Sequence, residues 1–113
     1  MEVTVIAQKP VTVLAIQGSV DGLTADSLTQ ALSAQLDAGH TQLVADLSGV
    51  SYISSAGLRS LLITLKSARA KQGDFRLAAV QPAVLNVLSM AGFNKLIKTF
   101  DNSAQAVESF SGN

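Results

Sequence analysis

Short stretches of alternating apolar and polar residues open the chain. The alternation runs over residues 3–7, breaks at Gln8-Lys9-Pro10 and resumes over residues 11–17, and Gly18 follows the second run. A period of two is typical of β-strands, because successive side chains point to opposite faces of a sheet. The pattern therefore predicts two short strands separated by a proline turn, which could form a hairpin.

The next segment changes to a helical period. Leu28, Leu32 and Leu36 recur every four residues, which places them on one face of a helix, and Gly39 is placed to end that helix. Residues 43–47, with the sequence LVADL, are too few for a helix and are apolar on both faces until Asp46. A strand of this kind is typical of the centre of a parallel sheet, where both faces are covered.

Helices and strands alternate over the rest of the chain. After a loop at 48–54, the predicted elements are a long helix closed by Gly73, a strand at 75–80, a helix from Pro82 to Gly92, a strand at 96–100 and a helix at 103–110. The apolar side chains expected to face inward from these three helices are Leu58, Leu61, Leu62, Leu65, Val84, Leu85, Val87, Leu88, Ala106, Val107 and Phe110.

This order of elements predicts the fold class. Strands that alternate with helices of this length imply right-handed crossovers and a mostly parallel sheet. The expected fold is therefore α/β, with a sheet of four or five strands flanked by about four helices. A chain of 113 residues has room for one such unit, so residues 1–113 are expected to form a single domain.

Composition narrows the possible functions. Hydrophobic residues make up 48% of the chain and charged residues 14%, as in a globular protein rather than a disordered one. Eight basic and eight acidic side chains cancel, which disfavours a nucleic-acid partner because proteins that bind nucleic acids usually carry a basic excess. The absence of cysteine excludes disulfides, thiolate catalysis and cysteine-ligated metals. With a single histidine as well, no metal and no cofactor are expected.

The sequence shows no targeting signal. No basic segment followed by a long apolar run opens it, and no apolar stretch reaches about 18 residues. Neither a signal peptide nor a membrane span is expected, so the expected location is the cytoplasm.

The segment 46–59, DLSGVSYISSAGLR, carries the most information about function. It leaves the carboxyl end of the predicted central strand, where ligands of open α/β sheets gather, and enters the start of the long helix. Ser54 or Ser55 is placed to cap this helix, and Gly57 allows a close approach of the backbone. A helix start also offers free N–H groups to an anion, so capping and anion recognition are both open for the two serines.

An enzymatic function is disfavoured at this place. Ser55 lies in SSAG, which lacks the first glycine of the nucleophile elbow. His40, the one available base, lies in a helix-to-strand turn, which belongs to the opposite rim of a parallel sheet. Asp21 and Asp46 could lie on the same rim as Ser55 and hold magnesium loosely, but capping of their own loops is the favoured interpretation. The chain is therefore not expected to be an enzyme.

Basic residues cluster on the long helix. Arg59, Ile63 and Lys66 follow the spacing i, i+4, i+7 beside the leucine face. A solvated helix side usually has this pattern, but an apolar side chain between two cations also suits a partner-binding surface.

The whole chain resembles the STAS domain family, and within it the stand-alone bacterial anti-sigma-factor antagonists. Gly18-Ser19-Val20-Asp21 resembles the G-x-(L/V)-D that ends the family's second strand. The run from Asp46 to Leu58 resembles the family signature (D/N)-L-x-x-(V/L)-x-(F/Y)-(M/I)-D-S-(S/T)-G-L. A later segment, Pro82 to Phe93, resembles the family segment that begins with P-x-V and ends with G-(L/F). The family's fold agrees with the one predicted from periodicity.

The resemblance implies a function in transcription control. In this family, a partner that is both an anti-sigma factor and a serine kinase phosphorylates the serine that follows the motif Asp, and a phosphatase reverses the modification. The unphosphorylated antagonist binds the kinase and frees the sigma factor. The acceptor position is Ser55 in this chain. Together with the basic stripe, the expected partner-binding residues are Asp21, Ser54, Ser55, Ala56, Gly57, Arg59, Ile63 and Lys66.

Two positions depart from the family's pattern. Ser54 stands where the family has Asp, and Ala56 stands where it has a second Ser or Thr. A carboxylate beside the acceptor could help to orient the serine or the kinase's metal, so its absence is expected to make phosphorylation less efficient. The serine that replaces it, Ser54, is also a rival acceptor. The alternative function is therefore a non-switching STAS interaction subunit or scaffold, for example in a lipid transporter or a signalling complex.

Overall fold

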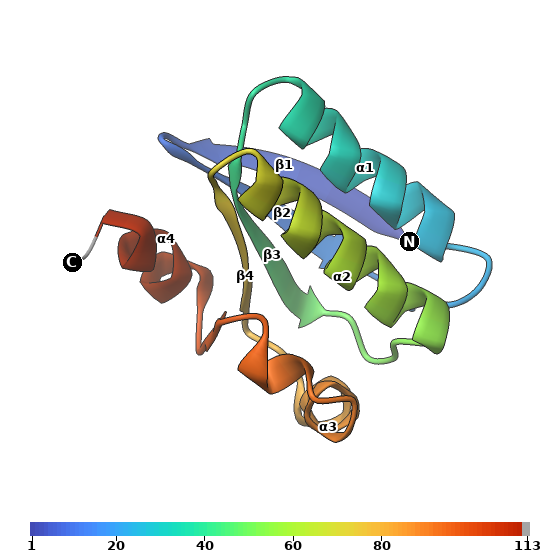
Figure 1. Ribbon diagram of the computed structural model, residues 1–113. Coiled ribbons are helices and arrows are strands. Elements are labelled where there is room, and N and C mark those ends of the chain that lie inside the picture. The colour runs from blue at the N-terminus through green and yellow to red at the C-terminus, as the bar shows by residue number, and fades with distance from the viewer. Residues whose placement is uncertain (112–113) are drawn as a thin grey trace.

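The elements form in the order that the sequence predicts, and the α/β fold class is confirmed (Figure 1). The computed structural model describes residues 1–111. None of the helices in that range has the length and hydropathy that a bilayer crossing requires. The elements are β1 (Glu2–Gln8), β2 (Val11–Gln17), α1 (Ala25–Asp37), β3 (Gln42–Gly49), α2 (Ser55–Ala70), β4 (Asp74–Ala78), α3 (Pro82–Met90), a 3-10 turn η1 (Phe93–Lys95), β5 (Thr99–Phe100) and α4 (Ser103–Ser111).

The five strands form one sheet in the order β1-β2-β3-β4-β5. β1 and β2 pair as an antiparallel hairpin, with Gln8 opposite Val11. The other three neighbouring pairs are parallel, and each is connected through a helix, which confirms the predicted mostly parallel sheet. As a result, the carboxyl ends of β2 to β5 lie along one rim of the sheet.

Two hydrophobic clusters cover the two faces of the sheet. α1 and α2 lie side by side on one face and α4 lies on the other (Figure 1). β3 is apolar on both sides because it contributes to both clusters: Leu43 and Leu47 belong to the larger cluster with α1 and α2, and Val44 belongs to the smaller one with α4. Leu61 of α2 is fully buried in the larger cluster, and Ala106 of α4 is fully buried in the smaller one, as predicted.

Helix α3 buries fewer side chains than predicted. Val84 and Leu88 are buried, whereas Leu85 is 38% exposed and Val87 is 36% exposed. The helix therefore packs through a single stripe at positions i and i+4. Its start is held by a hydrogen bond of 2.7 Å that Gln81 Nε2 donates to a backbone carbonyl near the end of β3. The prediction that Leu85 and Val87 face inward is wrong, because only one narrow side of α3 touches the rest of the fold.

Two strands are shorter than the sequence predicts. β4 ends at Ala78 instead of residue 80, because Ala79 adopts a left-handed φ of 55° and the chain turns there toward α3. The strand predicted at 96–100 is reduced to the two residues of β5, and the chain before it forms the η1 turn. Of the predicted last strand, only Thr99 and Phe100 pair with β4 in the described structure.

α2 ends at Ala70, and the chain turns at Gln72, whose φ is 66°, just before Gly73, the residue predicted to close the helix. A Cβ at Gly73 would lie 1.9 Å from the carbonyl oxygen of Thr41. The glycine therefore allows the chain leaving α2 to pass close to the turn that leads into β3.

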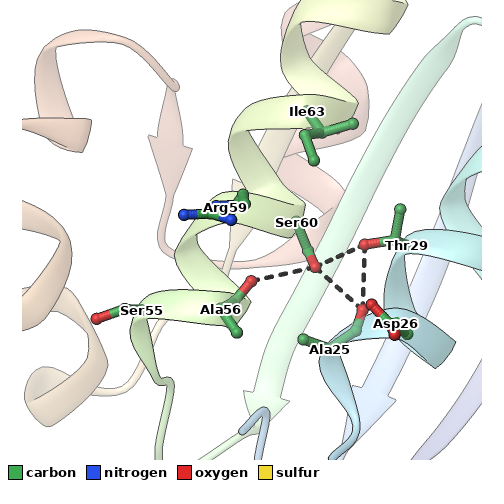
Figure 2. A pocket seen from close by; sticks show the side chains of 8 residues that line it. All are labelled: Ala25, Asp26, Thr29, Ser55, Ala56, Arg59, Ser60 and Ile63. Atoms are coloured by element: carbon green, nitrogen blue, oxygen red, sulfur yellow. Dashed lines mark hydrogen bonds between the residues drawn. The ribbon is translucent and has the colours of Figure 1, made fainter. Parts of the chain in front are cut away.

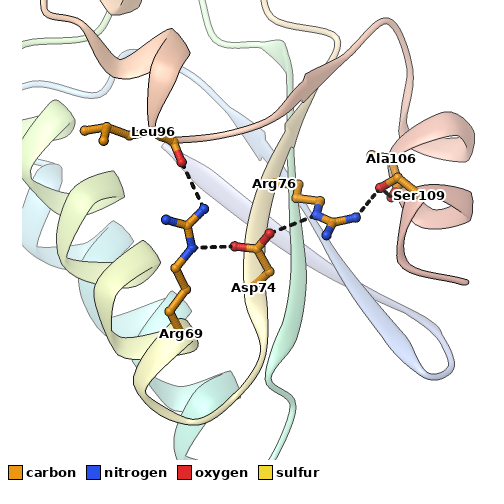
Figure 3. Close-up of polar contacts among 6 residues, drawn as sticks. All are labelled: Arg69, Asp74, Arg76, Leu96, Ala106 and Ser109. Atoms are coloured by element: carbon orange, nitrogen blue, oxygen red, sulfur yellow. Dashed lines mark hydrogen bonds and ion pairs between the residues drawn. The ribbon is translucent and has the colours of Figure 1, made fainter. Parts of the chain in front are cut away.

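A polar network fastens α4 and the η1 turn to β4 (Figure 3). Asp74 accepts hydrogen bonds from Arg69 Nε at 3.1 Å and from Arg76 Nε at 3.0 Å. Arg76 also donates to Ser109 Oγ at 2.7 Å, and its guanidinium lies 4.0 Å from the centre of the Phe110 ring. Arg69 reaches the carbonyl that follows η1. One carboxylate thus links the end of α2, the sheet and the last helix.

The free energy of unfolding is expected to fall as the pH drops below about 4, with Asp74 as one cause. Burial raises the pKa of Asp74, but hydrogen bonds from Arg76, from the Phe75 backbone and from Arg69 outweigh burial and hold that pKa below its usual value of 3.8. Since the pKa is lower in the folded state, the stabilisation is present above the usual value and is lost as the pH falls through the folded pKa. Urea denaturation at a series of pH values measures this decline. Asp74→Asn should make it shallower, and an equally steep decline in the variant would contradict the assignment.

Candidate functional site

Two loops at the carboxyl rim are hydrogen-bonded to each other. The Val20 N–H donates to the Tyr52 carbonyl at 3.0 Å, and the Ser54 N–H donates to the Val20 carbonyl at 2.8 Å. Val20 and Ile53 thereby form a one-residue parallel bridge beyond the ends of β2 and β3. The bridge brings the turn that contains Asp21 and the start of α2 to the same corner of the molecule.

The two serines at the start of α2 have different environments. Ser54 is half-buried and extended, with φ of −92° and ψ of 175°, and its Oγ accepts a hydrogen bond of 3.2 Å from the Gly57 N–H. Ser54 is therefore the N-cap of the helix. Ser55 is the first helical residue and is exposed, and its hydroxyl makes no hydrogen bond within residues 1–111. The sequence leaves open which of the two serines caps the helix, and the structure shows that it is Ser54.

Gly57 lies where the helix start touches the bridge. A Cβ on this residue would lie 2.6 Å from Ile53 Cγ1 and 2.7 Å from Val20 Cγ1. Both of these side chains are buried in the larger cluster. The predicted close approach at Gly57 is therefore confirmed, and it sets how near the first turn of α2 lies to the loop after β2.

The carboxylates of Asp21 and Asp46 accept hydrogen bonds from backbone N–H groups of their own turns. Asp21 Oδ1 accepts hydrogen bonds from the N–H groups of Leu23 at 2.9 Å and Thr24 at 3.1 Å, and these bonds lower the pKa of Asp21. Asp46 Oδ1 accepts from the Ser48 N–H at 2.9 Å. Within residues 1–111, no group of three or more His, Cys, Asp or Glu side chains is placed to hold a metal ion. These contacts favour loop capping over the magnesium interpretation for both residues.

The groove between α1 and α2 contains a pocket of about 310 Å³ beside Ser55 (Figure 2). Its floor is polar: the hydroxyl of Ser60, which is 3% exposed, donates to the Ala25 carbonyl at 3.0 Å and lies 2.6 Å from the Thr29 hydroxyl. Sequence reasoning missed Ser60 and Thr29, since a Ser or Thr among several polar residues of a helix gives no signal of its contacts. The lining residues are Ala25, Asp26, Thr29, Ser55, Ala56, Arg59, Ser60 and Ile63.

The outer side of α2 carries the predicted basic stripe. Arg59, Ile63 and Lys66 are all exposed, and Ile63 is 43% exposed although it is an aliphatic residue. His40 lies in the turn before β3, at the opposite rim from Ser55, as the sequence predicts. The structure therefore brings Asp21, Ser54, Ser55, Ala56, Gly57 and Arg59 to one corner and leaves the only histidine away from it.

Known proteins share the sequence pattern and the fold. The model of the STAS domain family matches residues 2–106. BtrV of Bordetella bronchiseptica, assigned as an anti-sigma factor antagonist, is 36% identical over 95 residues, which make up 84% of this chain and 82% of BtrV.

Solved structures resemble the whole fold. A Thermotoga maritima protein assigned as an anti-sigma factor antagonist superimposes with a TM-score of 0.92 at 22% identity, over 97% of this chain and 95% of its own. The anti-sigma factor antagonist SpoIIAA in its unphosphorylated form gives a TM-score of 0.84 at 16% identity, over 99% of this chain and 98% of its own. The phosphorylated form of SpoIIAA from Bacillus gives 0.74 at 15% identity, over 96% and 98%. At these identities the three structures show the fold alone.

Proposed function

Because the chain belongs to the STAS domain family, we propose that it is an anti-sigma-factor antagonist whose binding is switched by phosphorylation of Ser55. Its partner is an anti-sigma factor that is also a serine kinase, and a serine phosphatase restores the unphosphorylated form. The chain acts in the cytoplasm by binding and catalyses no reaction itself. The observation that supports this proposal most is the exposure of Ser55, at the start of α2 and beside the groove between α1 and α2.

The contacts of the two serines favour Ser55 over its rival. An acceptor hydroxyl must be free to approach the γ-phosphate of ATP, and Ser55 is exposed and makes no hydrogen bond within the described chain. Ser54 is half-buried and its oxygen already accepts the Gly57 N–H. Phosphorylation of Ser54 would remove this cap, which is worth about 0.5–2 kcal/mol.

A phosphate on Ser55 leaves the fold intact and disrupts an interface. It adds a charge of about −1.5 to −2 and three acceptor oxygens. The free N–H groups and the dipole at the start of α2 favour an anion there by about 0.3–1 kcal/mol, so the helix tolerates it. A partner packed against the same corner has to bury this charge, which costs several kcal/mol unless a cation meets it. Binding is therefore weakened while the fold is kept.

The proposed partner surface extends from the corner along α2. It comprises the turn at Asp21, the residues Ser54, Ser55, Ala56 and Gly57, and the stripe Arg59, Ile63 and Lys66. Two cations on either side of an exposed aliphatic side chain can steer an acidic partner and then provide an apolar contact.

Phosphorylation by the cognate kinase tests the site. With ATP and the kinase, the protein should gain one phosphate, and mass spectrometry of peptides should place it on Ser55. Ser55→Ala should abolish the modification. Ser54→Ala should retain it, although this variant loses its helix cap and should be less stable. A phosphate found on Ser54, or one that persists in Ser55→Ala, would contradict the assignment.

Ser54→Asp should raise the rate of phosphorylation. Aspartate is as good an N-cap as serine, so the helix start should be preserved. The variant restores the carboxylate that the family has beside the acceptor, where it could orient the hydroxyl or a metal of the kinase. Initial rates of phosphate transfer at equal protein concentration measure the effect. An unchanged or slower rate would show that the carboxylate has no such role in this chain.

The replacement of the family Asp by Ser54 also favours a second function, that of a non-switching STAS interaction subunit. Such a subunit binds its partner through the same surface but is never phosphorylated. Stable capture of a partner by the native protein, with no phosphate on Ser55 in any growth condition, would support this alternative over the switch.

A further inference from the structure

Arg59 lies one helical turn after Ser55 on the same side of α2. Both residues are exposed, and Figure 2 shows both side chains projecting away from α1. Within residues 1–111, the ion pairs are those of Asp74 with Arg69 and Arg76, and Arg59 takes part in neither. Its guanidinium is therefore available to a new anion at the start of the same helix.

We propose that phosphorylated Ser55 forms an intrahelical ion pair with Arg59. The inference rests on the proposed function for the presence of the phosphate, and on the geometry of α2 for its partner. Residues at i and i+4 of a helix have their Cβ atoms about 5–6 Å apart, and an anion that precedes the cation is the more favourable order. The planar guanidinium can donate two parallel hydrogen bonds to phosphate oxygens.

Neither Asp26 nor Asp21 forms an ion pair with Arg59 within residues 1–111. Asp26 lines the same pocket but belongs to α1. The Ser55 and Arg59 side chains project from the side of α2 that is turned away from α1 (Figure 2). Asp21 already accepts hydrogen bonds from two backbone N–H groups of its own turn. A phosphate on Ser55 carries more charge than either carboxylate and belongs to the same helix as the guanidinium.

The ion pair changes the partner surface in two ways. Phosphorylation places negative charge at the corner, and it also withdraws the Arg59 guanidinium from any acidic group of the partner. The first exposed cation of the stripe is thus lost to the interface when the phosphate appears. Phosphorylation of Ser55 therefore also reduces the positive charge that the surface along α2 offers to a partner.

Titration of the phosphate itself tests the ion pair without a partner or a kinase. Phosphoserine can be inserted at position 55 during translation, and ³¹P NMR then follows its second ionisation in the folded protein. A nearby cation lowers this pKa. Arg59→Gln should therefore raise the phosphoserine pKa by about 0.15–0.4 units, the size expected of a helical i, i+4 pair. High salt should reduce the difference.

Lys71→Gln is the matched control, because it removes one positive charge from the far end of α2. It should leave the phosphoserine pKa nearly unchanged, since the separation of about 24 Å along the helix exceeds the screening length. Equal values in the wild type and Arg59→Gln, or equal shifts in Arg59→Gln and Lys71→Gln, would overturn the ion pair. Failure of the kinase to modify Ser55 would instead overturn the proposed function and leave this titration unaffected.

Discussion

Leu61→Ala is expected to lower the free energy of unfolding by about 2–5 kcal/mol. Leu61 is completely buried, in the cluster that joins α1 and α2 to the sheet. Truncation removes apolar contacts and leaves a cavity that the surrounding strands can fill only in part. Urea denaturation of the isolated protein measures the loss, and no partner is needed to observe it.

Ile63→Ala is the control on the same helix. Ile63 lies two residues further on and is 43% exposed, so its truncation should change the free energy of unfolding by only about 0.5 kcal/mol. This variant should instead weaken partner binding, because Ile63 lies between the two cations of the stripe. If Leu61→Ala and Ile63→Ala unfold at the same urea concentration, the orientation of α2 against the sheet is wrong.

Phosphorylation of Ser55 is expected to weaken binding of the cognate anti-sigma factor by about 30-fold or more. Placing an unmatched charge in an interface costs about 2–5 kcal/mol, which corresponds to this range of dissociation constants. Titration calorimetry with unphosphorylated and Ser55-phosphorylated protein measures the difference. Ser55→Asp should weaken binding to a smaller degree, since one carboxylate has less charge and fewer acceptor oxygens than a phosphate.

Two measurements separate this effect from unfolding or from net charge. The phosphorylated protein should melt within a few degrees of the unmodified one, because the start of α2 accommodates an anion. Ser111→Asp adds one negative charge at the exposed end of α4, on the opposite face of the sheet, and should bind as the wild type does. Equal affinity of the phosphorylated and unphosphorylated forms would contradict the role of Ser55.

Strong periodicity made most of the fold predictable. The alternation around Gln8 and Val11 predicts the hairpin, and the short two-sided apolar run predicts β3 at the centre of the sheet. The leucine spacing predicts the buried side of α2, where Leu61 and Leu65 are buried. Prediction failed for α3, because its apolar residues occupy several sides of the helix and the pattern cannot show which side meets the sheet.

The candidate corner was predictable in its residues but not in its contacts. Ser54 and Ser55 are both good helix caps by residue type, and only the extended backbone of Ser54 decides between them. The bridge between Val20 and Ile53 joins two loops that are distant in sequence and have no alternating pattern. A local pattern shows no such pairing, although the glycine at position 57 is a sign that something approaches closely there.

Release of a sigma factor tests the central claim most directly. The unphosphorylated protein is added to a preformed complex of the cognate anti-sigma factor with its sigma factor, and free sigma factor is quantified by size-exclusion chromatography. Wild-type protein and Ser55→Ala should both release sigma factor in a dose-dependent manner, and the Ser55-phosphorylated protein should not. A complex that stays intact at excess unphosphorylated protein would contradict the assignment of this chain as an anti-sigma-factor antagonist.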